Sequence, residues 1–168
     1  ADPGEKTFFE VGADDIQKEF DLNMRGTWLP SKIMTPLMIG QQGACVLNVS
    51  SMSAFTPLTR IPGYSGAKAA VSNFTQWLAT YLARSGVRVN AIAPGFFMTE
   101  QNHALQFNPD GTPTPRCAHI VNGTPMRRYG ELKELIGAML FLVDERAASF
   151  VTGVVLPVDG GYSAFSGV

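Results

Sequence analysis

Three short apolar runs divide the chain, and segments with helical periodicity lie between them. The runs are Cys45 to Ser50, Val87 to Ile92 and Val154 to Val158. Each is too short for a buried helix and has the length of a strand. Because strands with buried faces need helices to cover them, the alternation predicts an α/β fold with a parallel sheet and right-handed crossovers.

Three helical segments are expected around these strands. The longest runs from about Tyr64 to Ser85 and ends at Gly86; its apolar stripe, at i, i+3, i+4, i+7 spacing, comprises Ala67, Ala70, Val71, Phe74, Leu78 and Tyr81. A helix over 131–143 has strict helical spacing of apolar residues and is expected to be a core helix. No internal repeat is found.

The third helix follows Asp14 and Asp15, which supply a cap and first-turn acids. Pro30 and Pro36 should kink or end it. Asn23 lies on the face of this helix that should meet the core. A buried amide must be hydrogen-bonded, so Asn23 is either a structural polar residue or part of a site.

Ser51, Tyr64 and Lys68 form the constellation with the clearest chemistry. Ser51 follows the first apolar run, so its hydroxyl should emerge at a strand end, where open α/β sheets bind ligands. Tyr64 and Lys68 are four residues apart on one helix face, and an ammonium beside a phenol favours the phenolate, as general acid/base catalysis requires. The pair alone also fits a helix start with one aromatic side chain and one solvated lysine.

Together these residues resemble the catalytic signature of the classical short-chain dehydrogenases/reductases, a serine followed by Tyr-x-x-x-Lys. The resemblance implies that Tyr64 exchanges a proton with the substrate oxygen, that Ser51 hydrogen-bonds that oxygen, and that Lys68 assists Tyr64 and holds the nicotinamide ribose. The segment from Asp21 to Thr27 is similar to the family's asparagine-bearing helix, which implies that Asn23 is a fourth catalytic residue supporting Lys68.

A second motif follows the second apolar run. Asn90, Pro94, Gly95 and Thr99 resemble the family pattern Asn-x-x-x-Pro-Gly-x-x-x-Thr. The resemblance implies that Pro94, Gly95, Phe97 and Thr99 lie beside the nicotinamide of NAD or NADP, with Tyr64 and Lys68 also binding the cofactor. Taken alone, the motif fits an ordinary strand-ending turn.

The family fold is a Rossmann-like, doubly wound parallel sheet, and only its C-terminal half is matched. The sequence contains neither the Gly-x-x-x-Gly-x-Gly turn that receives the pyrophosphate nor an Asn-Asn-Ala-Gly segment before the Asn23 helix. We therefore expect residues 1–168 to form a single domain, the catalytic half of such a fold. The residue that selects NAD or NADP belongs to the other half.

Residues 96–123 are rich in Asn, Pro, Gly and Thr and predict a long loop that serves as a substrate lid. Stretches of this segment and of the C-terminus most resemble the D-mannonate (fructuronate) oxidoreductase branch of the family, which implies a keto sugar acid as the small-molecule substrate. Candidate substrate contacts are Ser53, Arg60, Gln101, Asn102 and Arg116, although an arginine in such a loop is more often simply solvated.

Composition excludes several other classes of protein. A net charge of −1 gives no case for binding nucleic acid or an anionic membrane, and no apolar run approaches the roughly 20 residues of a membrane span. Two cysteines form no disulfide framework, so a reducing cytoplasm is expected. His103 and His119 lack partners at metal spacing, and no metal site is expected.

Two alternatives remain from the sequence. The half-domain could be a non-catalytic assembly module, because the Asn23 and Tyr64 helices form the main subunit interface of homodimers and homotetramers in the family. A second alternative is another carbonyl substrate, such as a steroid or an acyl thioester.

Overall fold

A parallel three-stranded sheet lies at the centre of the molecule, which we describe from a computed structural model of residues 7–167. The strands are β1 (Cys45–Val49), β2 (Arg88–Pro94) and β3 (Val155–Val158), in the spatial order β1-β2-β3. Val46 pairs with Val89, and Ile92 pairs with Leu156. The predicted parallel α/β sheet is confirmed, with strand bounds one or two residues from those expected.

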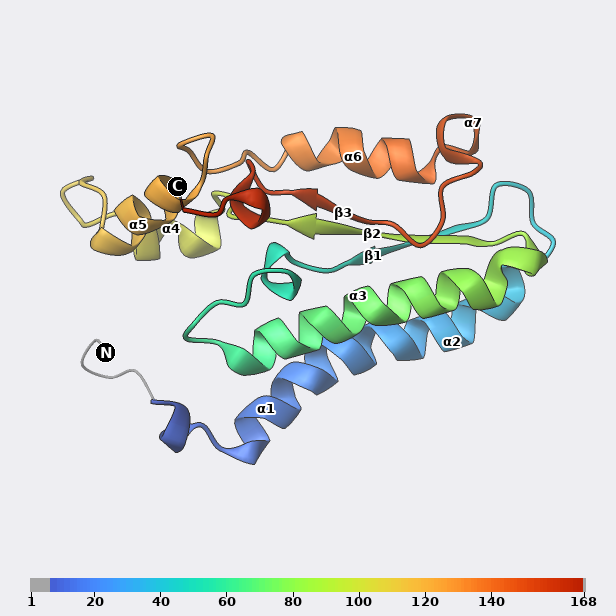
Figure 1. Cartoon of the computed structure of the whole chain (residues 1–168), viewed down its shortest axis with the longest axis horizontal. Helices are drawn as coiled ribbons and strands as arrows, with labels where there is room; N and C mark the ends of the chain where they lie inside the picture. The colour runs from blue at the N-terminus through green and yellow to red at the C-terminus, as the bar shows by residue number, and fades with distance from the viewer. Residues whose placement is uncertain (1–6, 168) are drawn as a thin grey trace.

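Helices cover both faces of this sheet, as a doubly wound fold requires (Figure 1). One face carries α1 (Ala13–Phe20), α2 (Gly26–Met38) and α3 (Pro62–Leu82), and the other carries α6 (Glu134–Val143) with the short α7 (Glu145–Ala148). Helices α4 (Glu100–Gln106) and α5 (Pro115–Gly123) lie at the end toward which the strand arrows point. Short 3-10 turns occupy 8–10, 52–54, 83–85 and 162–164.

The first helical region is longer than the sequence predicts. Its N-cap position is Gly12. Asp14 and Asp15 lie in the first turn as expected, and the Asp15 carboxylate supplies a cap by accepting a hydrogen bond from the Gly12 N–H at 3.3 Å. Between α1 and α2 the chain forms a π-helical turn, Asp21–Arg25. The two prolines do not end the helix, because α2 continues through Pro30 and Pro36 to Met38.

Packing explains why α2 survives its prolines. Met24, before Pro30, and Met38, after Pro36, both pack against the buried core. The hydroxyl of Thr27 donates to the Asn23 carbonyl at 2.8 Å, which adds a side-chain hydrogen bond to the helix. A proline costs about 3 kcal/mol in an isolated helix, and apolar packing on both sides can offset that cost.

Helix α3 begins and ends close to the predicted residues. Pro62 occupies the first turn, where its missing N–H costs nothing, and the helix therefore starts two residues before Tyr64. A 3-10 turn follows Leu82, and Gly86 ends it with a φ of +76°. That left-handed conformation is the reason for glycine at this position.

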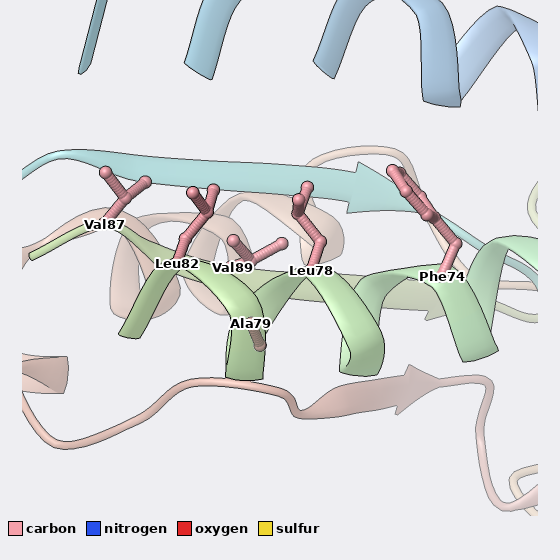
Figure 2. Close-up of a cluster of buried hydrophobic side chains, with 6 residues drawn as sticks. All are labelled: Phe74, Leu78, Ala79, Leu82, Val87 and Val89. Atoms are coloured by element: carbon pink, nitrogen blue, oxygen red, sulfur yellow. The ribbon is translucent and has the colours of Figure 1, made fainter. Parts of the chain in front are cut away.

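The main hydrophobic core lies between α3 and the sheet. It consists of Phe74, Leu78, Ala79, Leu82, Val87 and Val89. Figure 2 shows Phe74, Leu78 and Leu82 pointing from α3 toward β1. The predicted stripe is confirmed for its buried members, which are Ala67, Val71, Phe74 and Leu78. Tyr81, which was included in the stripe, is 69% exposed.

Helix α6 was expected to be a core helix, and this expectation is wrong for most of its surface. Leu142 is fully buried, whereas Ile136 is 52% and Leu140 is 60% exposed. Three strands about 4.8 Å apart form a narrow layer, which covers only one stripe of a helix that is apolar nearly all round. The apolar pattern predicted the helix, but it did not predict how much of the helix surface is buried against the described residues.

A buried arginine secures the end of α6. The guanidinium of Arg88, 9% exposed, donates to the carbonyls of Leu142 at 2.8 Å and Val143 at 3.3 Å. Carbonyls at a helix C-terminus lack partners within the helix, and a cation there also offsets the helix dipole. Arg88 thereby fixes α6 to the start of β2.

Residues 96–123 are not the bare loop that the sequence predicts, because they contain α4 and α5. Thr99 and Thr114 are the N-caps of these helices, and each accepts a hydrogen bond from a backbone N–H of the first turn. A side-chain cap depends on one residue at one position, so the overall composition of a segment does not reveal it. Within residues 7–167, no helix has both the length and the apolar character needed to cross a membrane.

The core predicts the effect of one truncation. Leu78→Ala should lower the free energy of unfolding by about 2–5 kcal/mol, because it removes a buried side chain and leaves a cavity. Urea unfolding measures the change. Gln76→Ala, at an exposed position of the same helix, is the matched control and should stay within about 0.5 kcal/mol. Equal losses in both variants would contradict this location of the core.

Candidate active site

The end of β1 and the first turns of α3 are joined by reciprocal hydrogen bonds. The ammonium of Lys68 donates to the carbonyl of Val49 at 2.9 Å. In return, the hydroxyl of Ser50 donates to the backbone carbonyl of Lys68 at 3.1 Å. Lys68 is therefore fixed through both its side chain and its backbone to the two residues that precede Ser51.

Tyr64 lies one helical turn before Lys68 and shares its side of α3. The Lys68 Nζ atom is 5.7 Å from the centroid of the Tyr64 ring, and both side chains are half-buried. Burial lowers the pKa of Lys68, while the negative charge of Glu19 opposes that shift. Among the described residues, no hydrogen bond involves the Tyr64 hydroxyl, which leaves it available to a ligand.

Ser51 lies at the strand end that the sequence predicts and is only 8% exposed. Its side chain caps the 3-10 turn 52–54 by accepting a hydrogen bond from the N–H of Ser53 at 3.2 Å. The hydroxyl of Ser53 also donates to the Ser51 oxygen, at 3.0 Å. This turn packs against α3, so Ser51 belongs to the same region as Tyr64 and Lys68.

Asn23 lies in the π-helical turn that precedes α2. Its amide donates to the backbone carbonyl and to the carboxylate of Glu19, both at 3.0 Å, and within residues 7–167 it forms no hydrogen bond with Lys68. Asn23 and Lys68 do line the same groove. Single π-turns inside α-helices are rare and frequent at functional sites, which agrees with a role for this residue.

A close approach of α1 brings this turn to α3. A Cβ atom on Gly63 would lie 3.0 Å from Ile16 Cδ1 and 3.4 Å from Glu19 Cγ. Glycine in the first turn of α3 therefore lets α1 pack against the helix immediately beside Tyr64. This contact is the reason that Glu19 reaches the neighbourhood of Lys68.

The groove beside β1 has a volume of about 480 Å³ and runs between this strand and α2. Ala44 and Ser50 hydrogen-bond to β2 through their backbones. Backbone groups alternate in direction along a strand, so Cys45, Leu47 and Val49 direct theirs away from β2 toward this groove. Within the described sheet, β1 is an edge strand.

The segment expected to meet the nicotinamide follows β2. A Cβ atom on Gly95 would lie 2.6 Å from Cα of Asp159, so this glycine permits the end of β2 to meet the end of β3. Phe97 forms an isolated bridge with Gly130, and Pro94 is the last residue of β2. Phe97 also lines a cleft of about 360 Å³ at the carboxyl ends of β2 and β3.

Thr99 and Asn102 form a capping box at the start of α4. The Asn102 N–H donates to the Thr99 hydroxyl at 3.2 Å, and the Thr99 N–H donates to the Asn102 side chain at 3.0 Å. The Asn102 amide also donates to the Phe97 carbonyl at 2.8 Å. Both ends of the Asn102 side chain are thus hydrogen-bonded to the backbone of Phe97 and Thr99.

The other candidate substrate residues are dispersed. Arg116 is exposed in the first turn of α5, and Arg60 is exposed in the loop between the 3-10 turn and α3. The side chain of Gln101, on α4, lies outside the part of the chain that the structure describes. The structure therefore gathers Ser51, Ser53 and the Tyr64–Lys68 pair more closely than it gathers the predicted substrate contacts.

A buried polar contact anchors the end of α4 within residues 96–123. The hydroxyl of Tyr129 donates to Gln106, at the end of α4, at 2.5 Å, and Gln106 is 3% exposed. Burial is the main cause of a raised pKa of Tyr129, and the neighbouring Cys117 raises it further. The phenol therefore stays protonated and remains a hydrogen-bond donor. In the described part of the chain, no cluster of three or more His, Cys, Asp or Glu side chains could hold a metal ion.

Sequence reasoning missed three participants. Ser50 and the Val49 carbonyl hold Lys68, and Glu19 binds Asn23. Glu19 stands four residues before Asn23, a spacing that places both on one helix face. The run Ser50-Ser51-x-Ser53 could have signalled a hydrogen-bonded turn, but a backbone acceptor such as Val49 leaves no mark in a sequence.

Comparison with known proteins supplies independent findings. A family model described as enoyl-(acyl carrier protein) reductase matches residues 1–163. An uncharacterized oxidoreductase of Haemophilus influenzae is 57% identical over 163 residues, which are 97% of this chain and 57% of the relative.

Solved structures agree with this match. The structure of a candidate D-mannonate oxidoreductase from Haemophilus influenza, with bound NAD, is 55% identical with a TM-score of 0.94, and the match covers 100% of this chain and 60% of that one. A candidate 2-deoxy-D-gluconate 3-dehydrogenase from Agrobacterium tumefaciens, with bound NADP, is 29% identical with a TM-score of 0.84, covering 96% and 63%. This chain thus spans about three fifths of the length of these proteins.

The contact between Gly95 and Asp159 yields a prediction. Gly95→Ala should lower the free energy of unfolding by about 1–3 kcal/mol, because the new methyl group meets the backbone at the end of β3. Gly137→Ala on α6 is the matched control, since, apart from its chain neighbours and the backbone of α6 itself, no described atom lies within 4 Å of its Cβ position. Alanine there should stabilise by about 0.5–1 kcal/mol through helix propensity. Thermal unfolding compares both, and a neutral Gly95→Ala would contradict the close approach.

Proposed function

Because the chain belongs to the short-chain dehydrogenase/reductase family, we propose that the protein carrying it is an NAD- or NADP-dependent oxidoreductase acting on a carbonyl or a secondary alcohol. Members of this family use nicotinamide cofactors, and the two related structures described above contain NAD or NADP. The chain represents only part of the length of its relatives, so the proposal concerns the protein expressed from its full reading frame.

One observation carries this proposal. Tyr64 and Lys68 are held on one side of α3, next to the end of β1, and Ser51 is the second residue after that strand. A half-buried phenol, an ammonium and a serine hydroxyl at the carboxyl end of a parallel strand are suited to proton transfer at an oxygen atom. The Tyr64 hydroxyl forms no hydrogen bond with the other residues described, which agrees with a role toward a ligand.

The residues present fit the nicotinamide end of the cofactor. The Lys68 ammonium has three N–H donors and uses one on Val49, so two remain for the hydroxyls of a ribose. The Thr99 hydroxyl and the backbone after β2 suit the carboxamide. The pyrophosphate end has no counterpart here, because the sequence contains no Gly-x-x-x-Gly-x-Gly turn.

When bound, the nicotinamide supplies or accepts the hydride at the substrate carbon. In the direction of reduction, Tyr64 gives its proton to the carbonyl oxygen as that oxygen gains negative charge. Ser51 donates a hydrogen bond to the same oxygen and stabilises the developing charge. Lys68 keeps a positive charge close to the Tyr64 ring and supports the phenolate that remains, and Asn23 orders the α1–α2 junction beside Lys68. Oxidation reverses each proton movement.

We propose a keto sugar acid as the substrate. The names of the two related structures, a mannonate oxidoreductase and a deoxygluconate dehydrogenase, support this class. Arg60 and Arg116 are the proposed partners of the carboxylate, with Gln101 and the remaining lid of residues 96–123 contributing polar contacts. Asn102, whose side chain is bound to the backbone of Phe97 and Thr99, holds this part of the lid in place. Both cysteines, Cys45 and Cys117, are free thiols, which suits the reducing cytoplasm where such metabolism is expected.

Tyr64→Phe tests this function. We expect kcat for D-fructuronate reduction to fall by about 10²- to 10⁴-fold, because the proton donor is lost. Binding of NADH or NADPH, followed by fluorescence, should persist. Tyr81→Phe, at an exposed position on the same helix, is the matched control and should retain activity.

The substrate proposal has its own outcomes in the same assay. Activity confined to a steroid or an acyl thioester carbonyl would contradict a sugar acid while supporting the oxidoreductase. Failure to turn over any of these carbonyls would contradict the catalytic proposal, and failure to bind NADH or NADPH as well would favour an assembly module.

We also propose that two or four copies associate through the helices carrying Asn23 and Tyr64. Large apolar side chains of α2 and α3 are exposed in the single chain: Trp28, Leu29, Ile33, Leu37 and Trp77, with exposed fractions of 40% to 71%. Homo-oligomer interfaces are rich in apolar and aromatic residues, so a second copy suits this surface.

Charge introduced on this surface should dissociate the assembly. Leu37→Lys combined with Trp77→Lys is expected to reduce the mass measured by light scattering to that of one protomer, because buried unpaired charges are strongly disfavoured. Phe150→Lys is the matched control: Phe150 is fully exposed, lies after α7 and should not affect the mass. An unchanged mass in the double variant would contradict this interface.

A further inference from the structure

The hydroxyl of Ser51 has both of its acceptor positions filled by one neighbour. The N–H of Ser53 donates to Ser51 Oγ at 3.2 Å, and the hydroxyl of Ser53 donates to the same atom at 3.0 Å. A serine hydroxyl has two acceptor lone pairs and one proton. With both lone pairs engaged, only the proton of Ser51 is left for a further hydrogen bond, and the described residues provide no acceptor for it.

We propose that Ser53 is a positioning residue that commits the Ser51 hydroxyl to donate toward the substrate oxygen. This inference rests on the proposed function, because it concerns the same oxygen that receives the proton of Tyr64. Without Ser53, the Ser51 hydroxyl could rotate and donate to other acceptors, including water. Ser53 thus prevents the Ser51 hydroxyl from donating to other acceptors before the substrate binds.

The burial of Ser53 favours this role over a direct contact with the substrate. Its side chain is 1% exposed, compared with 8% for Ser51. The hydroxyl of Ser53 therefore faces the protein interior, and its hydrogen bond to Ser51 satisfies a donor that would otherwise be costly to bury. The 3-10 turn 52–54 fixes the spacing of the two residues, since Ser51 caps the turn to which Ser53 belongs.

The chemical consequence is a preorganised donor. Charge develops on the substrate oxygen as the carbonyl is reduced, and a donor that needs no reorientation stabilises that charge most effectively. The oxygen of Ser51, polarised by two incoming hydrogen bonds, also holds its proton less tightly, which strengthens the hydrogen bond that it donates. Ser53 should therefore affect kcat more than KM.

A double-mutant cycle tests the role of Ser53 in the protein expressed from its full reading frame. Ser51→Ala, Ser53→Ala and the double variant are compared with the parent in reduction of D-fructuronate. Ser53→Ala should lower kcat by about 3- to 10-fold, the factor that one hydrogen bond represents, with KM changed less than about twofold. In the Ser51→Ala background, the same substitution should have no further effect on kcat.

Ser31→Ala is the matched control, because Ser31 is buried and its hydroxyl donates to the Thr27 carbonyl within α2. It should leave kcat unchanged, which separates the loss of any buried serine hydroxyl from the loss of Ser53. The four proteins of the cycle are also compared by urea unfolding, which needs no turnover and should reveal non-additive free energies for Ser51 and Ser53.

The outcomes separate this inference from the proposed function. Additive losses of kcat, or a rise in KM with unchanged kcat, overturn the positioning role and favour direct substrate contact by Ser53. A parent protein that turns over none of the carbonyl classes named above contradicts the proposed function. In that case the urea unfolding data still test the hydrogen bond between Ser53 and Ser51. Additive changes in the free energy of unfolding would show that the two residues do not interact.

Discussion

The hydrogen bond from Lys68 to the carbonyl of Val49 is the contact on which the candidate site depends. It joins α3 to β1 through a cation that must otherwise be solvated. A second hydrogen bond joins the same elements, from the Ser50 hydroxyl to the backbone carbonyl of Lys68. Since Ser51 follows Ser50 directly and Tyr64 precedes Lys68 by one turn, this pair of bonds sets the separation of the two groups proposed to act on one oxygen. Displacement of α3 along β1 would break both bonds together.

The sequence was sufficient for the parts of the site that lie on regular elements. The places of Ser51, Tyr64 and Lys68 could be predicted because a strand end and a four-residue helical spacing have fixed geometry, whereas the roles of these residues are implied by the family resemblance. The fold class followed for the same reason, from short apolar runs alternating with helical patterns. By contrast, the partners of these residues could not be foreseen, because Val49 contributes a backbone carbonyl and Glu19 reaches the site only through the close contact at Gly63.

Errors occurred where tertiary packing outweighs local preference. Pro30 and Pro36 signal a break, yet α2 continues because Met24 and Met38 pack against the core on either side. The polar composition of residues 96–123 predicted a bare loop, whereas side-chain caps at Thr99 and Thr114 begin two helices. The apolar pattern of α6 located the helix but could not reveal that Ile136 and Leu140 are exposed. Periodicity indicates which face is apolar, and only the neighbours determine whether it is covered.

The groove beside β1 has a consequence for handling the protein. The backbone groups of Cys45, Leu47 and Val49 point into it, and the strand that carries them is short, parallel and apolar. An uncovered edge of this kind is a template for pairing with strands of other molecules, and charged residues that normally discourage such pairing are absent from Cys45–Val49. We therefore expect a preparation of residues 1–168 alone to be prone to intermolecular β-pairing, increasingly so at higher protein concentration.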